Sequence, residues 1–132
     1  MQKRFSIDPN SVPIVRFVET LLFEAVAVRA SAVLMDLRDD RLRVRYRVSR
    51  ELTDRDSAPA NLLAPALARI KTLAGIKPDA RLPGEGSFTV LPRQCQHPVA
   101  VSALVRATSA QLKLQYHEQD IPPRTNQEEE DE

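Results

Sequence analysis

The sequence predicts a two-layer α+β domain, in which two helices cover one face of a mainly antiparallel sheet of about five strands. Two stretches carry apolar residues at helical spacing, over residues 13–28 and 61–75. Residues 41–48 alternate strictly between arginine and large apolar or aromatic side chains, the pattern of a strand with one buried face. Three β-prone runs between residues 87 and 116 predict further strands. A chain of 132 residues has room for one domain of ordinary size.

The first predicted helix runs from Pro13 to Val28. Ser11 can cap its start, and Pro13 suits a first turn, where a missing N–H costs nothing. Its apolar stripe consists of Ile14, Val18, Leu21, Ala25 and Val28, widened by Val15, Leu22 and Val26.

Two strands are predicted after this helix. The first is the apolar run from Ser31 to Leu37, and the second is the alternating stretch from Arg41 to Val48. The polar residues 38–40 between them suit a hairpin, so the two strands should be antiparallel neighbours. In the second strand, Leu42, Val44, Tyr46 and Val48 alternate with Arg41, Arg43, Arg45 and Arg47.

A second helix is predicted after the polar stretch 51–57. Asn61 can cap its start and Gly75 ends it. Pro65 must lie in the first turn, because deeper in the helix it would remove a backbone hydrogen bond. The apolar side consists of Leu63, Leu67, Ile70 and Ala74, with Ala66 and Leu73 beside them.

The rest of the chain predicts a turn, three strands and a tail. Residues 81–86 form the turn, and the strands are 87–91, 99–105 and 111–116. The predicted domain organisation is an N-terminal segment 1–11, a folded domain 12–118 and an acidic tail 119–132. We expect the tail to be disordered, because it has no periodicity and ends in five acidic residues.

Composition narrows the class of protein. The formal net charge of +1 is too small for nucleic-acid or anionic-membrane binding by bulk electrostatics. A single cysteine, Cys95, excludes an intramolecular disulfide and fits a reducing compartment. No apolar run has the length of a signal peptide core or a membrane span. The sequence therefore predicts a cytoplasmic protein that does not insert into a membrane.

The sequence offers little catalytic chemistry. A phosphate-binding loop, Gly-x-x-x-x-Gly-Lys-Ser/Thr, is missing, because glycine occurs only at positions 75, 84 and 86. We therefore predict no ATP hydrolysis by this chain alone. Cys95, His97 and the distant His117 fall short of a zinc site, so no metal and no cofactor are predicted. No nucleophile, base and acid can be assigned as a triad, and Asp36, Asp39 and Asp40 fit ordinary turn chemistry.

Several stretches resemble the N-terminal subdomain of type II secretion and type IV pilus assembly ATPases, in order and spacing over residues 12–118. They are Pro13-Ile14-Val15-Arg16-Phe17-Val18, Arg29-Ala30-Ser31, Leu42-Arg43-Val44-Arg45-Tyr46-Arg47-Val48, Leu67-Ala68-Arg69-Ile70-Lys71 with Leu73-Ala74-Gly75, and Arg81-Leu82-Pro83. The resemblance implies a PAS-like arrangement of the sheet and helices. It covers no motor domain.

The polar signatures of the family are altered. Where the family continues Asp-Ile-His-Ile-Glu-Pro, this chain has Ala32-Val33-Leu34-Met35-Asp36-Leu37, so that only Asp36 keeps an acid. Ser49-Arg50 stands in place of Asp-Gly, and Gly84-Glu85-Gly86-Ser87 in place of Gln-Asp-Gly-Arg. A scaffold kept while its polar residues change suggests a relaxed or changed function.

The resemblance implies a non-catalytic interaction or regulatory module whose partner is a secretion or pilus ATPase, or a second copy of itself. In the family, arginines of this subdomain approach the nucleotide phosphates of the motor domain, and Arg43 and Arg45 match them. One alternative is therefore an accessory that supplies these arginines in trans to an ATPase site. Another is a PAS-like small-molecule sensor, although an aromatic content of 5% gives no sign of a ligand pocket.

The candidate interaction residues are Arg43, Arg45 and Arg47. A cationic ladder at two-residue spacing can contact a partner, or it can be the solvated face of a strand with opposite charges nearby. Nucleic acid is disfavoured, because Tyr46 is the one aromatic residue nearby and points to the opposite face.

Overall fold

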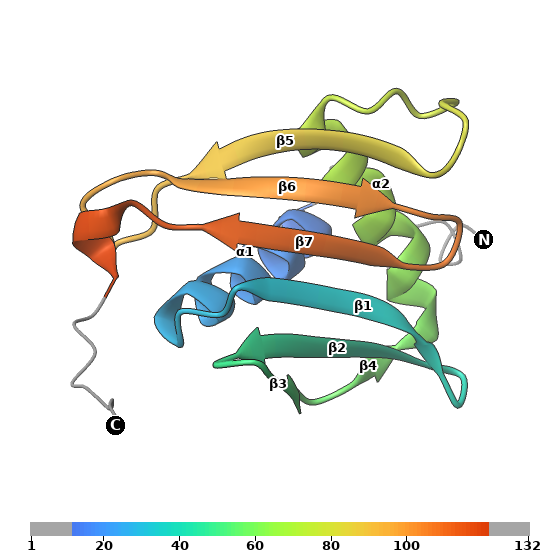
Figure 1. Cartoon of the computed structure of the whole chain (residues 1–132). Coiled ribbons are helices and arrows are strands. Elements are labelled where there is room, and N and C mark those ends of the chain that lie inside the picture. Colours follow the sequence, from blue (N-terminus) through green and yellow to red (C-terminus); the bar gives the residue numbers. More distant parts are fainter. Residues whose placement is uncertain (1–11, 122–132) are drawn as a thin grey trace.

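The computed structural model describes residues 12–121, which form two α-helices on one face of a seven-stranded sheet (Figure 1). The elements are α1 (Val12–Ala27), β1 (Ala32–Arg38), β2 (Arg41–Val48), β3 (Glu51–Asp54), β4 (Ala58–Pro59), η2 (Ala60–Leu62), α2 (Leu63–Ala74), β5 (Gly84–Val90), β6 (Val99–Val105), β7 (Ala110–Gln115) and η3 (Glu118–Asp120). All strand pairs among these residues are antiparallel. The predicted two-layer α+β class is confirmed.

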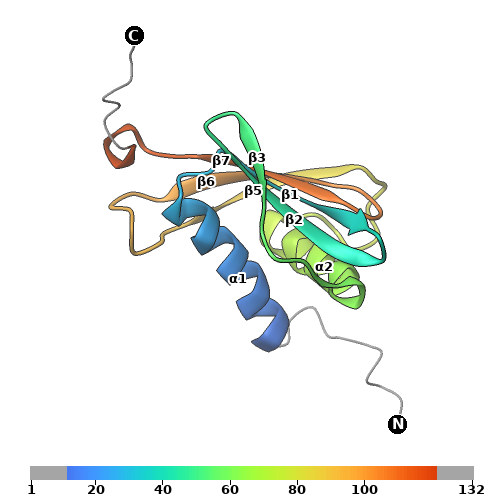
Figure 2. The same cartoon turned by 90° about the horizontal axis from the view of Figure 1, so that it is seen from below.

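The strand order is β3-β2-β1-β7-β6-β5, with β4 also paired to β2. The last strand of the chain, β7, therefore lies in the middle of the sheet between β1 and β6. This order agrees with the PAS-like arrangement that the resemblance implies. Figure 2 shows both helices on the same side of the sheet, so within residues 12–121 the other face has no covering layer.

The core lies between the sheet and the two helices. Alternation along β2 sends Leu42 and Val44 into it, and both are fully buried. Leu21 of α1 and Ile70 of α2 meet the sheet from the other side and are buried as well. The two stripes read from the sequence are therefore the faces that the helices bury, except that the predicted Val28 lies beyond the end of α1 and is exposed.

Tyr46 brings a polar network into this core. Its hydroxyl donates to a carboxylate oxygen of Glu24 on α1 at 2.7 Å, and it lies 3.2 Å from the carbonyl oxygen of Leu21. Arg55, between β3 and β4, binds both oxygens of Glu24 at 2.8 and 3.2 Å. The network joins α1, β2 and the β3–β4 corner. Its hydrogen bonds satisfy a buried hydroxyl that would otherwise destabilise the fold.

The predicted count of about five strands is too low, because the sequence reading missed β3 and β4. Both fall in or beside the polar stretch 51–57. All four residues of β3 are exposed, so no apolar alternation marks it. At the sheet edge, β3 is held by pairing to β2 rather than by burial, whereas β4 pairs with β2 and also buries Ala58.

The predicted turn 81–86 is wrong at its end, because Gly84 and Gly86 belong to β5. A Cβ atom at position 86 would lie 2.2 Å from the carbonyl oxygen of Ala74 at the end of α2. Glycine is required here by the close approach of helix and strand, and not by the turn that the sequence predicts.

The helix ends are mostly as predicted. Gly75 ends α2 with a φ of 74°, and Pro65 lies in its first turn. Asn61 is not the cap, because η2 precedes α2 and no side chain caps it. The predicted cap Ser11 lies outside the described residues.

Two hairpin turns flank β2. The predicted β1–β2 hairpin is confirmed, with Asp39 and Asp40 both at positive φ. A second hairpin joins β2 to β3 through Ser49 and Arg50, whose φ values are 51° and 76°. Two successive positive φ values are typical of the type I′ turn that matches strand twist. Arg50 holds this conformation without the freedom of a glycine.

Leu21→Ala and Leu67→Ala should each lower the free energy of unfolding by about 2–5 kcal/mol, because each removes a large side chain from the packed core. Leu21 is 1% and Leu67 5% exposed. Chemical denaturation measures the loss. The control is Thr20→Ala on the exposed side of α1, which should change stability by about 0.5 kcal/mol or less. Near-neutral results at both leucines would contradict the assigned faces.

Arg50→Gly should raise the free energy of unfolding by about 0.5–1 kcal/mol. Relief of the left-handed conformation outweighs the added entropy of the unfolded chain. Thermal unfolding of the variant is the measurement. Glu51→Gly, one residue on inside β3, should instead destabilise the domain, so a loss in both variants would rule out relief of strain.

Candidate functional site on the uncovered sheet face

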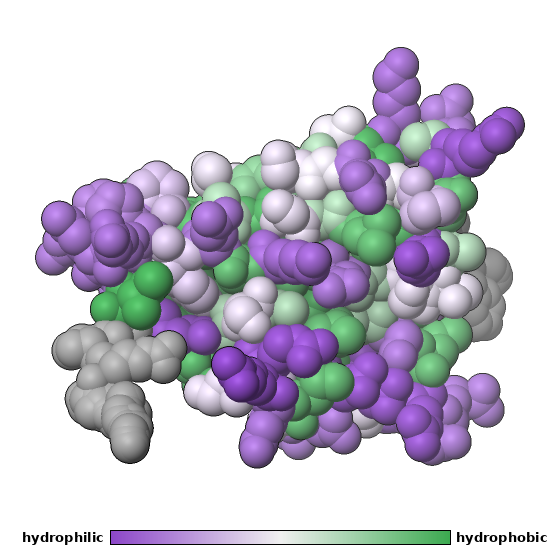
Figure 3. Space-filling model, viewed as in Figure 1, coloured by the Kyte–Doolittle hydropathy of each residue, from purple (hydrophilic) through white to green (hydrophobic). Residues whose placement is uncertain are grey.

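The predicted arginines all lie on the sheet face that neither described α-helix covers. Arg43 pairs across the β1–β2 ladder with Asp36, Arg45 with Leu34 and Arg47 with Ala32. Strand alternation places them together, opposite the buried residues of β2. Figure 3 views this face, where hydrophilic side chains surround apolar patches.

Arg43 is held by an internal carboxylate. Its Nε and Nη2 atoms donate to the two oxygens of Asp36 at 2.9 and 2.8 Å, a bidentate pair. The Arg43 guanidinium holds the pKa of the Asp36 carboxyl below its ordinary value. The donors best suited to an external anion are therefore already occupied.

Arg45 is only partly satisfied. Its Nη2 lies 3.8 Å from Asp36, and the side chain is 22% exposed. Its Nε is buried and has no hydrogen-bond partner among the described residues. An unmatched buried donor of this kind lowers the stability of the fold.

Arg47 and Lys113 differ from these two arginines. Among residues 12–121, no carboxylate lies within ion-pair distance of either side chain. Lys113 stands on β7, and both residues pair with Ala32 of β1. Arg43 and Arg45 thus share one carboxylate, whereas Arg47 and the nearby Lys113 have no ion-pair partner among residues 12–121.

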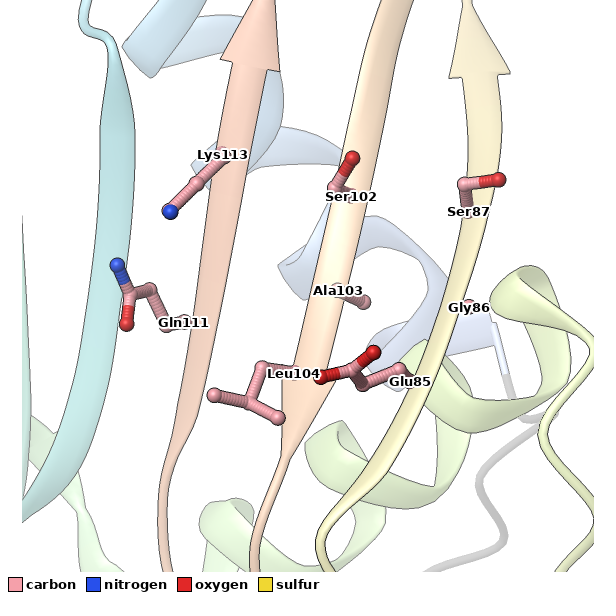
Figure 4. A pocket seen from close by; sticks show the side chains of 8 residues that line it. All are labelled: Glu85, Gly86, Ser87, Ser102, Ala103, Leu104, Gln111 and Lys113. Atoms are coloured by element: carbon pink, nitrogen blue, oxygen red, sulfur yellow. The ribbon is translucent and has the colours of Figure 1, made fainter.

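A shallow depression of about 500 Å³ adjoins Lys113 on the same face (Figure 4). Its polar lining includes Ser102 of β6, Ser87 and Glu85 of β5, and Gln111 of β7. Figure 4 shows these side chains standing off three neighbouring strands. The arrangement can donate hydrogen bonds and offer charge, but it assembles no nucleophile with a general base.

Arg41 has a structural task. Its Nε lies 3.1 Å from the Ser57 hydroxyl, which ties the start of β2 to the segment leading into β4. This arginine is the member of the predicted ladder that faces the sheet edge.

A second polar cluster lies at one end of the sheet. The Asp120 carboxylate accepts hydrogen bonds from the backbone N–H groups of Gln96 and His97 at 3.0 and 2.9 Å. The bond from Gln96 is the main reason that the pKa of the Asp120 carboxyl is lowered. The rings of His97 and His117 stack with centroids 3.7 Å apart. The Arg29 Nε donates to the carbonyl oxygen of Asp120 at 3.0 Å. The cluster fastens the segment after β7 to the β5–β6 loop and to the α1–β1 turn.

The surroundings of this cluster are structural. Burial raises the pKa of the Cys95 thiol, which disfavours a nucleophilic thiolate. Burial also raises the pKa of Tyr116 to about 12, and its hydroxyl donates to the carbonyl oxygen of Ala30 at 2.6 Å. Across residues 12–121, no three His, Cys, Asp or Glu side chains are arranged to hold a metal ion. Neither described α-helix is long and apolar enough to cross a membrane.

Comparison with known proteins decides the family. Residues 8–120 match the family described as type II/IV secretion system protein. The chain belongs to this family. A relative, the type II secretion system protein E of Xanthomonas campestris pv. campestris, is 37% identical over 78 residues. That alignment covers 58% of this chain and 14% of the relative, so the chain spans only a small part of its length.

The resemblance of residues 12–118 to the N-terminal region of secretion ATPases is therefore confirmed. The altered signatures of this type II/IV secretion system protein can now be placed. Ala32, where the family motif has Asp, lies between Arg47 and Lys113. Ser49-Arg50, in place of Asp-Gly, still forms a two-residue hairpin turn.

The sequence reading of this secretion-system domain missed Lys113 and the two serines. The signal for Lys113 is present, because residues 110–115 of β7 alternate and place Gln111, Lys113 and Gln115 on one face. What the sequence could not supply was the neighbour of β7. Only the observed strand order brings Lys113 next to β1.

Asp36→Asn should lower stability at neutral pH and flatten its decline in acid. Because Arg43 lowers the folded-state pKa of Asp36, the charged carboxyl adds stability above its unfolded pKa of about 4. This contribution is lost as the pH falls through the folded-state pKa. Urea unfolding from neutral pH to about pH 2.5 measures both effects. In an Arg43→Gln background the same substitution should have little effect, and an undiminished effect would point to another partner.

Proposed function

We propose that this member of the type II/IV secretion system family is a non-catalytic interaction or regulatory module. Its partner is a secretion or pilus assembly ATPase, and contact is made through the uncovered face around β2. The observation that carries the proposal is the position of Arg43, Arg45 and Arg47 on a face without a covering layer. Oppositely charged groups across an interface steer encounter and set register.

The non-catalytic part of the proposal rests on the sequence. Phosphoryl transfer needs a loop of backbone N–H groups with a lysine to hold the phosphates, and the three glycines at 75, 84 and 86 are not spaced for one. We place the module in the cytoplasm, where the ATPase partner would meet its nucleotide. A second copy of the chain is the other partner consistent with the resemblance.

A second role is favoured by one observation. Arg47 has no ion-pair partner among the described residues, whereas Asp36 occupies the guanidinium of Arg43. If the module supplies an arginine in trans to an ATPase site, that task falls to Arg47 rather than to the family's matching positions. Added protein would then raise the ATPase rate, and Arg47→Ser would remove the increase without reducing co-purification to background.

The Arg43→Ser/Arg45→Ser variant should co-purify with the secretion ATPase of the same cell about tenfold less than wild type, because it removes charge from the contact face. Added salt should weaken the wild-type interaction, since exposed charges are screened over about 8–10 Å. Thermal unfolding of the variant checks its fold, because Arg43 also binds Asp36.

Purified wild-type protein alone should release no phosphate from ATP above background.

The matched control is Arg16→Ser/Lys77→Ser, which removes the same charge from α1 and the loop after α2, away from the uncovered face. It should co-purify like wild type. Equal losses in both double variants would mean that net charge, and not this face, drives association. A wild-type chain that brings down no ATPase would refute the proposed partner.

A further inference from the structure

A row of side chains crosses the uncovered face from β2 to β5. By the strand registers it runs Arg47, Ala32, Lys113, Ser102 and Ser87. Ala32 is therefore a small apolar residue between two cations. Their strands are about 10 Å apart, two strand spacings, so both long side chains can reach one group above Ala32.

The two cations are available to a ligand. Arg43 and Arg45 share Asp36, but no described carboxylate pairs with Arg47 or Lys113. Figure 4 shows the ammonium group of Lys113 turned from β7 toward β1, the strand that carries Ala32. Ala32 is 4% exposed, so its methyl group lies below the surface between the two charged residues.

The chemistry beside this row favours a polypeptide over a free phosphate or nucleotide. Asp36 and Asp54 pair across the ladders with Arg43 and Arg45, so they share this face with the arginines, and Glu85 lines the depression. These acids would repel a compact anion that carries two or more charges on one group, whereas a peptide spaces single carboxylates along its chain. The half-buried Leu34 and Leu104 offer apolar contacts nearby. Mixed charge with apolar area fits an acidic side chain carried on a peptide.

We propose that Arg47 and Lys113 bind a carboxylate side chain from an extended acidic segment of the partner protein. This rests on the proposed function, because it names the chemistry of the partner at the same face. The carboxylate lies above Ala32 and accepts from the guanidinium and the ammonium group. The chain on its far side crosses the depression, where the Ser102 and Ser87 hydroxyls are hydrogen-bond donors.

The test adds a penta-glutamate peptide to the full chain. Binding is monitored by NMR through the backbone amide resonances of β1, β2 and β7. We expect saturable shifts centred on Ala32, Arg47 and Lys113. Arg47→Gln or Lys113→Gln should weaken binding about threefold, and the double variant about tenfold. Arg16→Gln/Lys77→Gln is the control of equal charge, and it should bind like wild type. Penta-glutamine and inorganic phosphate at matched ionic strength should not shift these amide resonances.

The most specific variant is Ala32→Asp, which adds an internal carboxylate between the two cations while keeping both. It should fold and lose peptide binding, and Ala32→Ser should keep it. Wild-type affinity in Ala32→Asp, or equal shifts with phosphate, would overturn the proposal. A second test uses a full-length variant in which residues 128–132 are changed to Gln and Asn. If that change alone shifts the Ala32 and Lys113 amides, the chain's own acidic run occupies the site and the partner assignment is wrong.

These outcomes are independent of the ATPase. Failure of the wild-type chain to co-purify with the ATPase, with penta-glutamate binding intact, would refute the proposed partner and leave the acidic-segment site standing. Co-purification without penta-glutamate binding would refute the acidic-segment site and leave the proposed partner standing.

Discussion

Along β2 the buried side chains Leu42, Val44 and Tyr46 alternate with Arg43, Arg45 and Arg47, and this alternation constrains the sheet on both faces. A slip of one residue in the pairing with β1 would place guanidinium groups under the helices and expose the apolar side chains. Burying an unpaired charge costs several kcal/mol, so the register has no close competitor. Tyr46 adds a second restraint, because its hydroxyl must reach Glu24 on α1. The face that forms the core and the face that is left for binding are thus fixed by one strand.

Much of the fold could be predicted from the sequence, because its main signals are local. The spacing of Leu21 and its neighbours marks α1, and the alternation of residues 41–48 gives the bounds of β2 as observed. The failures have non-local causes. β3 is exposed and exists because β2 offers it an edge. Gly86 is a strand residue because the end of α2 lies against it, a contact between elements that no periodicity records.

The candidate site was only half predictable for the same reason. Period-two spacing places the three arginines on one face without knowledge of the fold. Which of them is free depends on the residue across the ladder: Asp36 for Arg43, and Ala32 for Arg47. The partnership of Arg47 with Lys113 depends on β7 joining β1, a pairing between strands about 80 residues apart in sequence. The strand register therefore decides the effect of the altered signature, because it places Ala32 between Arg47 and Lys113.

The central position of β7 has a mechanical consequence. Beyond this strand, Asp120 is fastened by Gln96, His97 and Arg29, so tension from the chain that follows is delivered to the end of β7 through a fixed point. A strand at a sheet edge can be peeled away one hydrogen bond at a time. β7 is paired on both sides, so a pull along its axis loads the ladders with β1 and β6 in shear, and many bonds must break together. A pull on the chain beyond Asp120 would therefore load the whole sheet instead of unzipping one strand.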